Sequence, residues 1–293
     1  MKLPTFGILC LVAIILTSVP AHSRNASPRE FTMHCEKDRN IIKSILDSLG
    51  SNGEDAGARV AEASKEFVGT PYKHSPLDSM PDKFVIDVCG MDCVTLVETS
   101  LALASASMKR NVLWTDFPAE LENLRYRGGN SSGYASRLHY FCDWISDNVY
   151  RGNIIEITQM LDHEYFQTKT LDYMTKHVGQ YSALKDSATF EKIRNLEAGF
   201  CNYKIPYIKK ESLLKKNVRS MLASGDIIVF LTKEPGLDCS HVGIIEMRGN
   251  DIYLIHASSA KGKVTAEKKP LQTMLRDEYR HCPGIRILRI RTD

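Results

Sequence analysis

The segment that follows Cys93 constrains the fold of this chain more than any other. Apolar side chains lie on more than one side of a predicted helix there: Val94, Leu96, Val97, Leu101 and Leu103. A helix that is apolar around much of its circumference is buried on several sides, so other elements must surround it. The preceding turn, Gly90-Met91-Asp92, places Cys93 on the first turn of this helix. The sequence therefore predicts a central helix with a cysteine at its N-terminus.

The hydrophobic period changes along the chain. Helical spacing predicts helices over residues 35–49 and 56–68, and strand-like runs cover residues 226–232, 242–247, 252–257 and 284–291. Helices first and turn-separated strands last predict an α+β fold with an antiparallel sheet. Residues 116–203 combine a Gly-rich loop with further helical patterns, and we expect a helical insertion there.

The N-terminus has the features of a signal peptide. Lys2 precedes an apolar run over residues 6–19, and Ala21-His22-Ser23 supplies small residues for cleavage after Ser23. The run is short for a membrane span, although an uncleaved anchor helix is the alternative. We therefore expect residues 1–23 to be removed, export to the periplasm or beyond, and no stable membrane anchor. Cys10 follows Leu9 rather than a small residue, which argues against a lipid anchor.

Charge and cysteine content narrow the classes of function. The net charge of +3 is too balanced to indicate a nucleic-acid-binding protein. The basic stretch 204–219 is either a solvated face or a surface that attracts an anionic polymer. Cys10 lies in the predicted signal peptide, so an odd number of the 8 cysteines remains in the mature chain. At least one thiol is then unpaired even in an oxidising compartment, which is consistent with a reactive cysteine.

Two histidines in the predicted sheet can be placed by counting. If Gly249-Asn250 is a two-residue turn, Arg248 pairs with Asp251 and Gly243 faces His256. His241 and His256 then lie on one face as diagonal neighbours, with Cα atoms about 7–8 Å apart. A shift of one residue would put the two histidines on opposite faces.

Cys93, His241 and His256 together resemble the parts of a nucleophilic site. A helix N-terminus favours the thiolate; His241 would transfer the proton, and His256 would orient His241. The Cys93 N–H is a candidate oxyanion donor. Alternatively, Cys93 and His241 are buried core residues, or Cys89, Cys93, His241 and His256 bind zinc. The spacing of Cys89 and Cys93 is one residue longer than the common C-x₂-C, and we expect neither a metal nor a cofactor.

In these residues the chain resembles the NlpC-type cell-wall cysteine hydrolases, a branch of the papain-like fold. The motifs of that family occur in the same order from about residue 60 to the C-terminus: Gly69-Thr70-Pro71-Tyr72, Asp92-Cys93, Gly225-Asp226, His241-Val242-Gly243-Ile244 and His256-Ala257. The resemblance implies N-terminal helices, a central helix with the cysteine, and an antiparallel sheet with the histidines. It also implies a single catalytic domain over residues 24–293, with a Cys-His-His set that acts on peptidoglycan fragments.

The chain departs from that pattern in two ways. It has Val94-Thr95 where family members usually have Ser-Gly, and the interval from Cys93 to His241 is far longer than in the compact family core. These features, with Ser136-Arg137-Leu138-His139-Tyr140 and Asp143-Trp144-Ile145, resemble an exported N-acetylmuramoyl-L-alanine amidase-like branch. That resemblance implies cleavage between N-acetylmuramic acid, particularly its 1,6-anhydro form, and L-alanine. The alternatives are a D-glutamyl–diamino acid endopeptidase and a non-catalytic module that binds muropeptides.

The resemblance also implies substrate-binding residues. Tyr72 and Asp92 would lie in the substrate groove, where Asp92 either binds a substrate ammonium group or caps the helix that starts at Cys93. A sugar-facing wall would consist of Arg137, His139, Tyr140 and Trp144, whose alternative is ordinary packing of an amphipathic helix. We expect the protein to act as a monomer on muropeptides, without nucleic acid.

Overall fold

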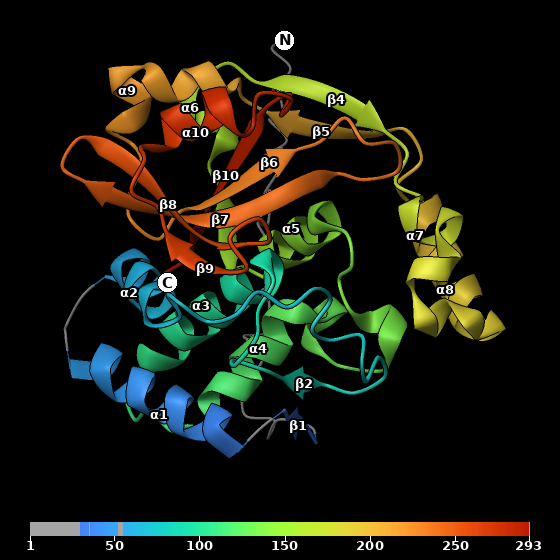
Figure 1. Ribbon diagram of the computed structural model, residues 1–293. Helices are drawn as coiled ribbons and strands as arrows, with labels where there is room; N and C mark the ends of the chain where they lie inside the picture. Colours follow the sequence, from blue (N-terminus) through green and yellow to red (C-terminus); the bar gives the residue numbers. More distant parts are fainter. Residues whose placement is uncertain (1–29, 35, 52–54, 293) are drawn as a thin grey trace, which may run out of the picture.

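A computed structural model describes residues 30–34, 36–51 and 55–292 of the chain. The predicted signal peptide, residues 1–23, and the cysteines Cys10 and Cys35 lie outside the described residues. No helix within the described ranges is long and apolar enough to cross a membrane. The expected α+β class is confirmed, since the structure combines helices with antiparallel sheets (Figure 1).

The main sheet has six antiparallel strands in the order β3-β10-β6-β7-β8-β9. Its strands are β3 (Ile154–Glu156), β6 (Ile227–Leu231), β7 (Cys239–Arg248), β8 (Asp251–Ser258), β9 (Lys263–Ala266) and β10 (Ile285–Ile290). Two small sheets complete the strands: β1 (Thr32–Met33) with β2 (Val85–Ile86), and β4 (Tyr165–Lys169) with β5 (Tyr203–Tyr207). The strands expected near residues 226–232, 242–247, 252–257 and 284–291 correspond to β6, β7, β8 and β10.

Helices cover both faces of this sheet (Figure 1). On one face lie α1 (Glu36–Ser51), α2 (Ala56–Glu66), α3 (Cys93–Ser107), α4 (Asp116–Arg125) and α5 (Phe141–Tyr150). On the other face lie α6 (Thr158–Leu161), α9 (Lys216–Arg219) and α10 (Leu271–Asp277). Strand β6 is buried on both faces because its side chains alternate between two cores. Ile227 and Val229 pack into the core under α3, and Ile228 and Phe230 pack into the core under α10.

The predicted central helix is confirmed, because most residues of α3 are buried. Leu96, Val97, Leu101 and Leu103 of α3 are each at most 1% exposed. Helices α1, α2 and α4 and strands β7 and β8 all pack against α3. These neighbours surround α3, which explains why its apolar side chains lie on several sides of the helix. This environment holds the N-terminus of α3, and Cys93 with it, against β7.

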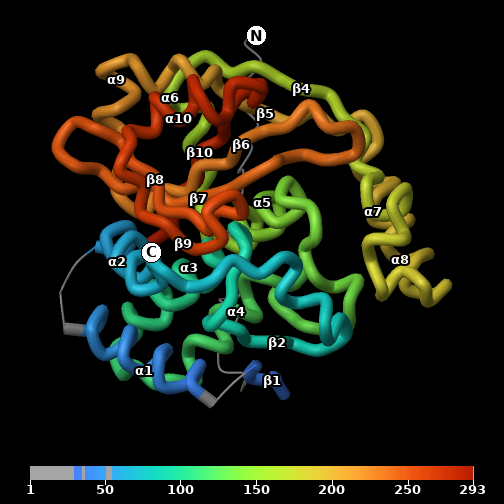
Figure 2. Tube along the Cα trace, in the orientation of Figure 1, coloured from blue at the N-terminus to red at the C-terminus, as the bar shows by residue number. Residues whose placement is uncertain are grey.

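The segment 116–203 differs from a purely helical insertion. It contains α4, α5, α6, α7 (Tyr173–Lys176) and α8 (Ser187–Ala198), but also β3 and β4. β3 pairs with Leu288 to Ile290 of β10 and forms the edge of the main sheet. Its Ile154 side chain packs into the core and anchors this edge strand. α7 and α8 stand out at one side of the body (Figure 2).

The β7–β8 hairpin has the register expected from the sequence. Arg248 pairs with Asp251 and Ile244 with Ile255, and Gly249 has a positive φ of 62° in the turn. The predicted two-residue turn is confirmed. A Cβ atom on Gly243 would lie 3.2 Å from His256 Cβ and 2.6 Å from Leu254 Cδ1. Only glycine fits there, which lets the His256 side chain pack beside the β7 backbone.

Candidate functional site

Cys93 is the first residue of α3, and Asp92 caps that helix. Asp92 Oδ1 accepts a hydrogen bond from Thr95 N at 2.8 Å, and Thr95 Oγ1 accepts one from Asp92 N at 2.9 Å. This reciprocal capping box satisfies two backbone donors at the helix start. The capping alternative for Asp92 is therefore realised. Thr95, which belongs to the Val94-Thr95 departure from the family motif, completes the box.

Burial dominates the titration of Cys93. Burial, and then the negative charge of Asp92, raise the pKa of the thiol to about 12. Hydrogen bonds from backbone amides of Val242, Cys93 and Val94 lower the pKa without offsetting the burial. The amides at the helix start do favour the thiolate, as expected, but desolvation outweighs them and the net pKa is raised. Cys93 is a neutral thiol at neutral pH.

His241 and His256 meet in the way that the hairpin register predicts. His241 Nε2 lies 2.6 Å from His256 Nδ1, and the two rings are edge to face with centroids 4.9 Å apart. His241 lies on β7 and His256 on β8, where His256 is only 3% exposed. Burial, and then the proximity of His256, lower the pKa of His241 to about 3. The imidazole of His241 is therefore neutral at neutral pH.

Glu267 continues this chain of hydrogen bonds. Its Oε1 lies 2.9 Å from His256 Nε2, and Lys261 Nζ bonds both carboxylate oxygens. Burial raises the pKa of Glu267, but the hydrogen bonds from Lys261 and His256 outweigh it and the net pKa is lowered. Glu267 is therefore a carboxylate that accepts from His256 Nε2–H. His256 Nδ1 then accepts from His241 Nε2–H, which leaves the lone pair of His241 on Nδ1.

Cys93 and His241 line one cavity of about 270 Å³ between α3, β7 and the segments before α5. Four of the other residues expected in the site line it as well: Asp92, Arg137, His139 and Tyr140. Further lining residues come from the stretch before Cys93, from the α7 region and from the start of β7: Asp78, Met174, Tyr181, Asp238 and Ser240. The cavity therefore brings Cys93 and His241 together with a wall of mixed polar and apolar side chains.

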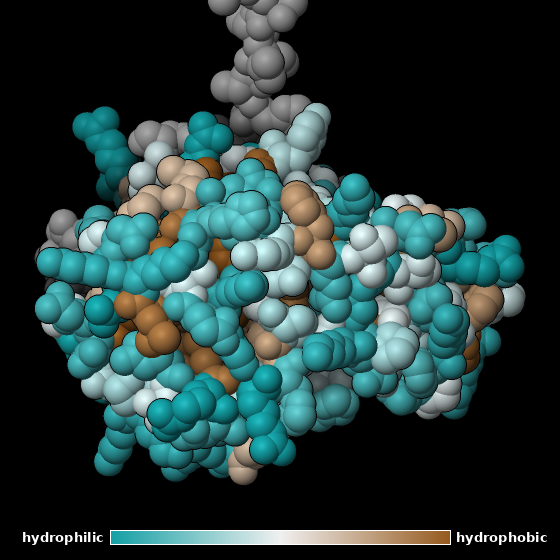
Figure 3. Space-filling view, turned by 90° about the horizontal axis from the view of Figure 1, so that it is seen from above, coloured by the Kyte–Doolittle hydropathy of each residue, from teal (hydrophilic) through white to brown (hydrophobic). Residues whose placement is uncertain are grey.

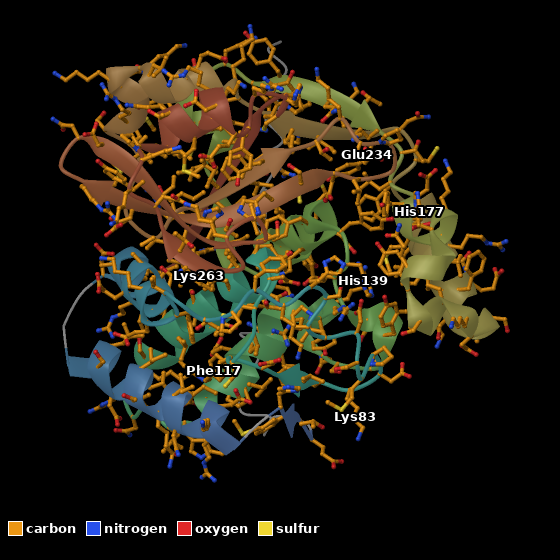
Figure 4. The ribbon with its side chains drawn as sticks, viewed as in Figure 1. Lys83, Phe117, His139, His177, Glu234 and Lys263 are labelled. Atoms are coloured by element: carbon orange, nitrogen blue, oxygen red, sulfur yellow. The ribbon has the colours of Figure 1, made fainter. Side chains whose placement is uncertain are left out.

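The wall around Arg137 is held by internal contacts. Arg137 Nη2 donates to Asp78 Oδ1 at 2.6 Å, and the guanidinium lies over the ring of Tyr134. His139 Nε2 is 2.9 Å from Tyr134 O, and its Nδ1 is 3.4 Å from Arg137 Nη2. Burial, and then the charge of Arg137, lower the pKa of His139 well below its usual value. Figure 4 shows His139 between the sheet and the lower helices, toward α7. His139 is thus a fixed, neutral part of the wall.

Tyr140 connects the wall to the protruding helices. Its hydroxyl donates to Glu197 Oε1 at 2.6 Å and accepts from Met174 N at 3.0 Å. Glu197 lies on α8, and Met174 on α7 lines the cavity. Tyr140 therefore sets the position of α7 and α8 relative to the site. Figure 4 marks His177 on the same protrusion.

Tyr72 and Trp144 do not line the cavity with the others. Tyr72 is half-buried beside Met91, and burial followed by the charges of Cys93 and Asp92 raises its pKa to about 12. It therefore lies close to Cys93. Trp144 is fully buried and stacks on Phe141 with centroids 4.8 Å apart. The expected sugar-facing place of Trp144 is corrected, because its stripe of α5 faces the core.

Sequence reasoning missed Glu267 and Tyr279. The Tyr279 ring stacks on His241 with centroids 5.8 Å apart, and nothing in its local sequence indicates this. Glu267 could have been found by extending the strand pairing. If Ser258 pairs with Lys263 across the turn, His256 pairs with Thr265, and Glu267, two residues further along, lies on the same face as His256. The pairing of His256 with Thr265 follows that count.

The other sequence-based alternatives for binding gain no structural support. Within residues 30–34, 36–51 and 55–292, no group of three or more His, Cys, Asp or Glu side chains is arranged to hold a metal ion. Most basic side chains of the stretch 204–219 are exposed, although some of them have partners within the protein. Lys210 donates to three carbonyl oxygens at the end of α10, and Lys215 pairs with Asp162 at 2.6 Å. Figure 3 shows that this side is mainly hydrophilic with separate small hydrophobic spots.

Three solved structures resemble the chain along most of its length. An N-acetylmuramoyl-L-alanine amidase from Bacteroides uniformis is 31% identical with a TM-score of 0.74, covering 81% of this chain and 99% of that one. A Bacteroides fragilis protein with a provisional xylanase assignment is 35% identical with a TM-score of 0.71, covering 78% and 99%. A Legionella pneumophila protein is 24% identical with a TM-score of 0.68, covering 88% and 95%, which supports the fold alone.

No curated protein matches the chain by sequence. The family model called AmiA-like, described as N-acetylmuramoyl-L-alanine amidase-like, matches residues 62–284. That range includes Cys93, both site histidines, Glu267 and the cavity wall. The chain belongs to the AmiA-like family of N-acetylmuramoyl-L-alanine amidase-like proteins.

Proposed function

We propose that this protein is a peptidoglycan hydrolase that cleaves the amide between N-acetylmuramic acid and L-alanine, including the 1,6-anhydro form of the sugar. The observation that carries the proposal is the joint placement of Cys93 and His241 in one cavity, with His256 hydrogen-bonded behind His241. The family and the Bacteroides uniformis amidase support the choice of bond. The proposal keeps the papain-like assignment of the fold and a single catalytic domain over residues 24–293.

The proposed reaction begins from a neutral pair. His241 Nδ1 takes the proton of the Cys93 thiol while Sγ attacks the carbonyl carbon of the lactyl group. This sequence follows from the two pKa values, which leave both groups uncharged before substrate binds. The arrangement is general-base catalysis on a thiol rather than attack by a preformed thiolate.

The rest of the cycle uses the same two residues. The tetrahedral intermediate collapses as the C–N bond breaks, and protonated His241 gives its proton to the amine of L-alanine. A thioester then joins Cys93 to the muramyl lactyl group. Water, deprotonated by His241, attacks this thioester and releases the muramic acid carboxyl group and the free thiol. The Cys93 N–H at the start of α3 is the proposed donor to the oxyanion.

The cavity wall gives the proposed substrate contacts. Arg137 and His139 form a rigid polar surface through Asp78 and Tyr134, which suits hydroxyl and carboxylate groups of a muropeptide. Tyr140 acts through Met174 and α7, and Tyr72 and Asp92 flank the nucleophile on the side of Met91. A wall that is already hydrogen-bonded loses little entropy when a ligand binds.

The proposal also covers the setting of the reaction. Residues 1–23 would direct export to the periplasm or beyond, the mature protein would act as a monomer without a stable membrane anchor, and its partners would be muropeptides. Catalysis would need neither metal nor cofactor, since Cys93 supplies the nucleophile and His241 the proton transfer.

The bond assignment is tested with two defined substrates and mass spectrometry of the products. Anhydromuramyl-L-alanyl-D-glutamyl-diamino acid should give the free anhydromuramic sugar and a tripeptide that begins with L-alanine. The sugar-free tripeptide should remain intact. Release of anhydromuramyl-L-alanyl-D-glutamate would instead establish the endopeptidase alternative. Binding of the muropeptide with no cleavage of any substrate would establish the binding-module alternative.

A further inference from the structure

Glu267 is a buried acid that the proposed Cys-His-His set does not include. It follows β9, is 4% exposed, and reaches His256 Nε2 through Oε1 at 2.9 Å. Its carboxylate also accepts hydrogen bonds from Lys261, in the loop between β8 and β9. The cavity that holds Cys93 and His241 is not lined by Glu267, so any effect on the reaction must pass through His256.

The sheet register explains why Glu267 faces His256. His256 pairs with Thr265 across β8 and β9, and Glu267 N donates to Leu254 O at 2.8 Å. Glu267 therefore lies opposite Leu254, and residues two apart on a strand point to one face. The carboxylate is a diagonal neighbour of the His256 ring, within reach of its far nitrogen.

We propose that Glu267 is a positioning residue that fixes the tautomers of His256 and His241, so that His241 offers Nδ1 to the thiol. A carboxylate only accepts hydrogen bonds, so His256 must place its proton on Nε2. His256 Nδ1 then has only a lone pair and takes the proton of His241 Nε2. Without the acid, either proton arrangement of the imidazole pair is possible, and one of them puts the proton on His241 Nδ1. The catalytic meaning of this order rests on the proposed function.

Lys261 influences the charge state of Glu267. It bonds both oxygens of Glu267 and is itself 44% exposed in its side chain. The other charged or titratable groups that act on this cluster come from the segment after α10, with Glu278 and Tyr279, and from β7, with His241 and Arg248. Arg248 Nη1 donates to Glu267 O. Lys261 supplies the cation that helps to keep the pKa of Glu267 low.

The direct test reads the imidazole protons by NMR. Full-length mature protein labelled with ¹⁵N-histidine should show His256 protonated on Nε2 alone and His241 protonated on Nε2 with Nδ1 bare. Glu267→Ala should convert both residues to mixtures of tautomers. Glu267→Gln keeps an acceptor oxygen and should retain most of the wild-type pattern. The same tautomer pattern in wild type and Glu267→Ala would overturn the proposal.

Kinetics separate a positioning role from a structural one. Glu267→Ala should lower kcat by about 10-fold to 100-fold with little change in KM, and Glu267→Gln should recover most of that loss. Lys261→Ala removes the cation that lowers the pKa of both Glu267 and His256, so protonation of the imidazole pair should occur more readily and the acid limb of the kcat/KM profile should move to higher pH. Lys269→Ala removes an exposed cation that pairs with Glu278, and its profile should match that of wild type.

These readouts also distinguish the inference from the proposed function. If wild type cleaves no muropeptide, the amidase proposal fails while the tautomer pattern still decides the role of Glu267. If Glu267→Ala does not fold, Lys261→Ala decides, and an acid limb that stays in place would overturn the proposal. An equal loss of kcat in Glu267→Ala and Glu267→Gln, with wild-type tautomers in both, would also overturn it.

Discussion

His241 Nε2 lies 2.6 Å from His256 Nδ1, and the two rings meet at an interplanar angle of 82°. One nitrogen of each ring is therefore committed to the other ring. Since Glu267 fixes the remaining nitrogen of His256, only Nδ1 of His241 is available for proton transfer. The hydrogen bonds therefore run in one direction, from His241 through His256 to the Glu267 carboxylate, and His241 Nδ1 remains as the proposed base at the cavity.

The two histidines should differ in their effect on turnover. His241→Ala removes the group that transfers the proton and should lower kcat by about 10³-fold. His256→Ala removes only the group that orients His241, so its loss should be about 10-fold to 100-fold. Steady-state kinetics on anhydromuramyl-tripeptide measure both. A loss in His256→Ala equal to or greater than that in His241→Ala would reverse the assignment of roles.

The pKa values predict an unusual pH dependence for the cysteine. His241, with a pKa of about 3, is a neutral base at all pH values well above 3, and activity should fall as the pH drops toward that value. Cys93, with a pKa of about 12, stays protonated through the neutral range. The kcat/KM profile should therefore be flat around neutrality.

Alkylation provides the matching chemical test. The rate at which iodoacetamide modifies Cys93 in the substrate-free protein should still be rising with pH above pH 9, because the thiolate fraction grows toward the pKa of about 12. Peptide mass spectrometry identifies the modified residue. A rate that reaches its plateau below pH 7 would show a preformed thiolate and contradict the neutral pair.

Asp92 separates the charge effect from the capping effect. Asp92→Asn keeps an acceptor for Thr95 N but removes the negative charge, so the pKa of Cys93 should fall and alkylation at pH 8 should become faster. Thr95→Val is the matched control, since it removes one bond of the capping box and leaves the charge. It should cost about 1 kcal/mol of unfolding free energy without faster alkylation. Equal alkylation rates in wild type and Asp92→Asn would contradict the charge effect.

Gly243 should be intolerant of a side chain. A Cβ atom there would meet Leu254 Cδ1 at 2.6 Å and His256 Cβ at 3.2 Å, so Gly243→Ala should cost about 1–3 kcal/mol and displace His256. Urea denaturation with a parallel activity assay measures both effects. Gly50→Ala is the control, because no heavy atom lies within 4 Å of a Cβ there and the residue is in α1. It should stabilise by about 0.5–1 kcal/mol; equal stability of the two variants would refute the packing argument.

The sequence predicted those parts of the fold that follow from local periodicity. α1, α2, α3 and the hairpin of β7 and β8 follow from apolar spacing and one two-residue turn. Because that turn fixes the register, the contact between His241 and His256 could be predicted before any coordinates. β3 and β4 were missed: β3 has only three residues, and β4 contains exposed and half-buried residues rather than the continuous apolar run that marks β6.

The remaining errors concern properties that depend on the whole fold. Trp144 was placed on a substrate wall, but the side of α5 that faces the core is decided by packing against Phe141 and its neighbours. The pKa of Cys93 was expected to fall because the helix terminus is visible in the sequence, whereas burial is not. Glu267 reaches His256 across a turn of four residues, whose pairing the sequence alone left open.

The most direct test of the central claim compares wild type with Cys93→Ala on anhydromuramyl-tripeptide. Wild type should release anhydromuramic sugar and free tripeptide, while Cys93→Ala should fold, bind the substrate and release neither product. Cleavage by Cys93→Ala at a rate close to that of wild type would contradict catalysis by Cys93.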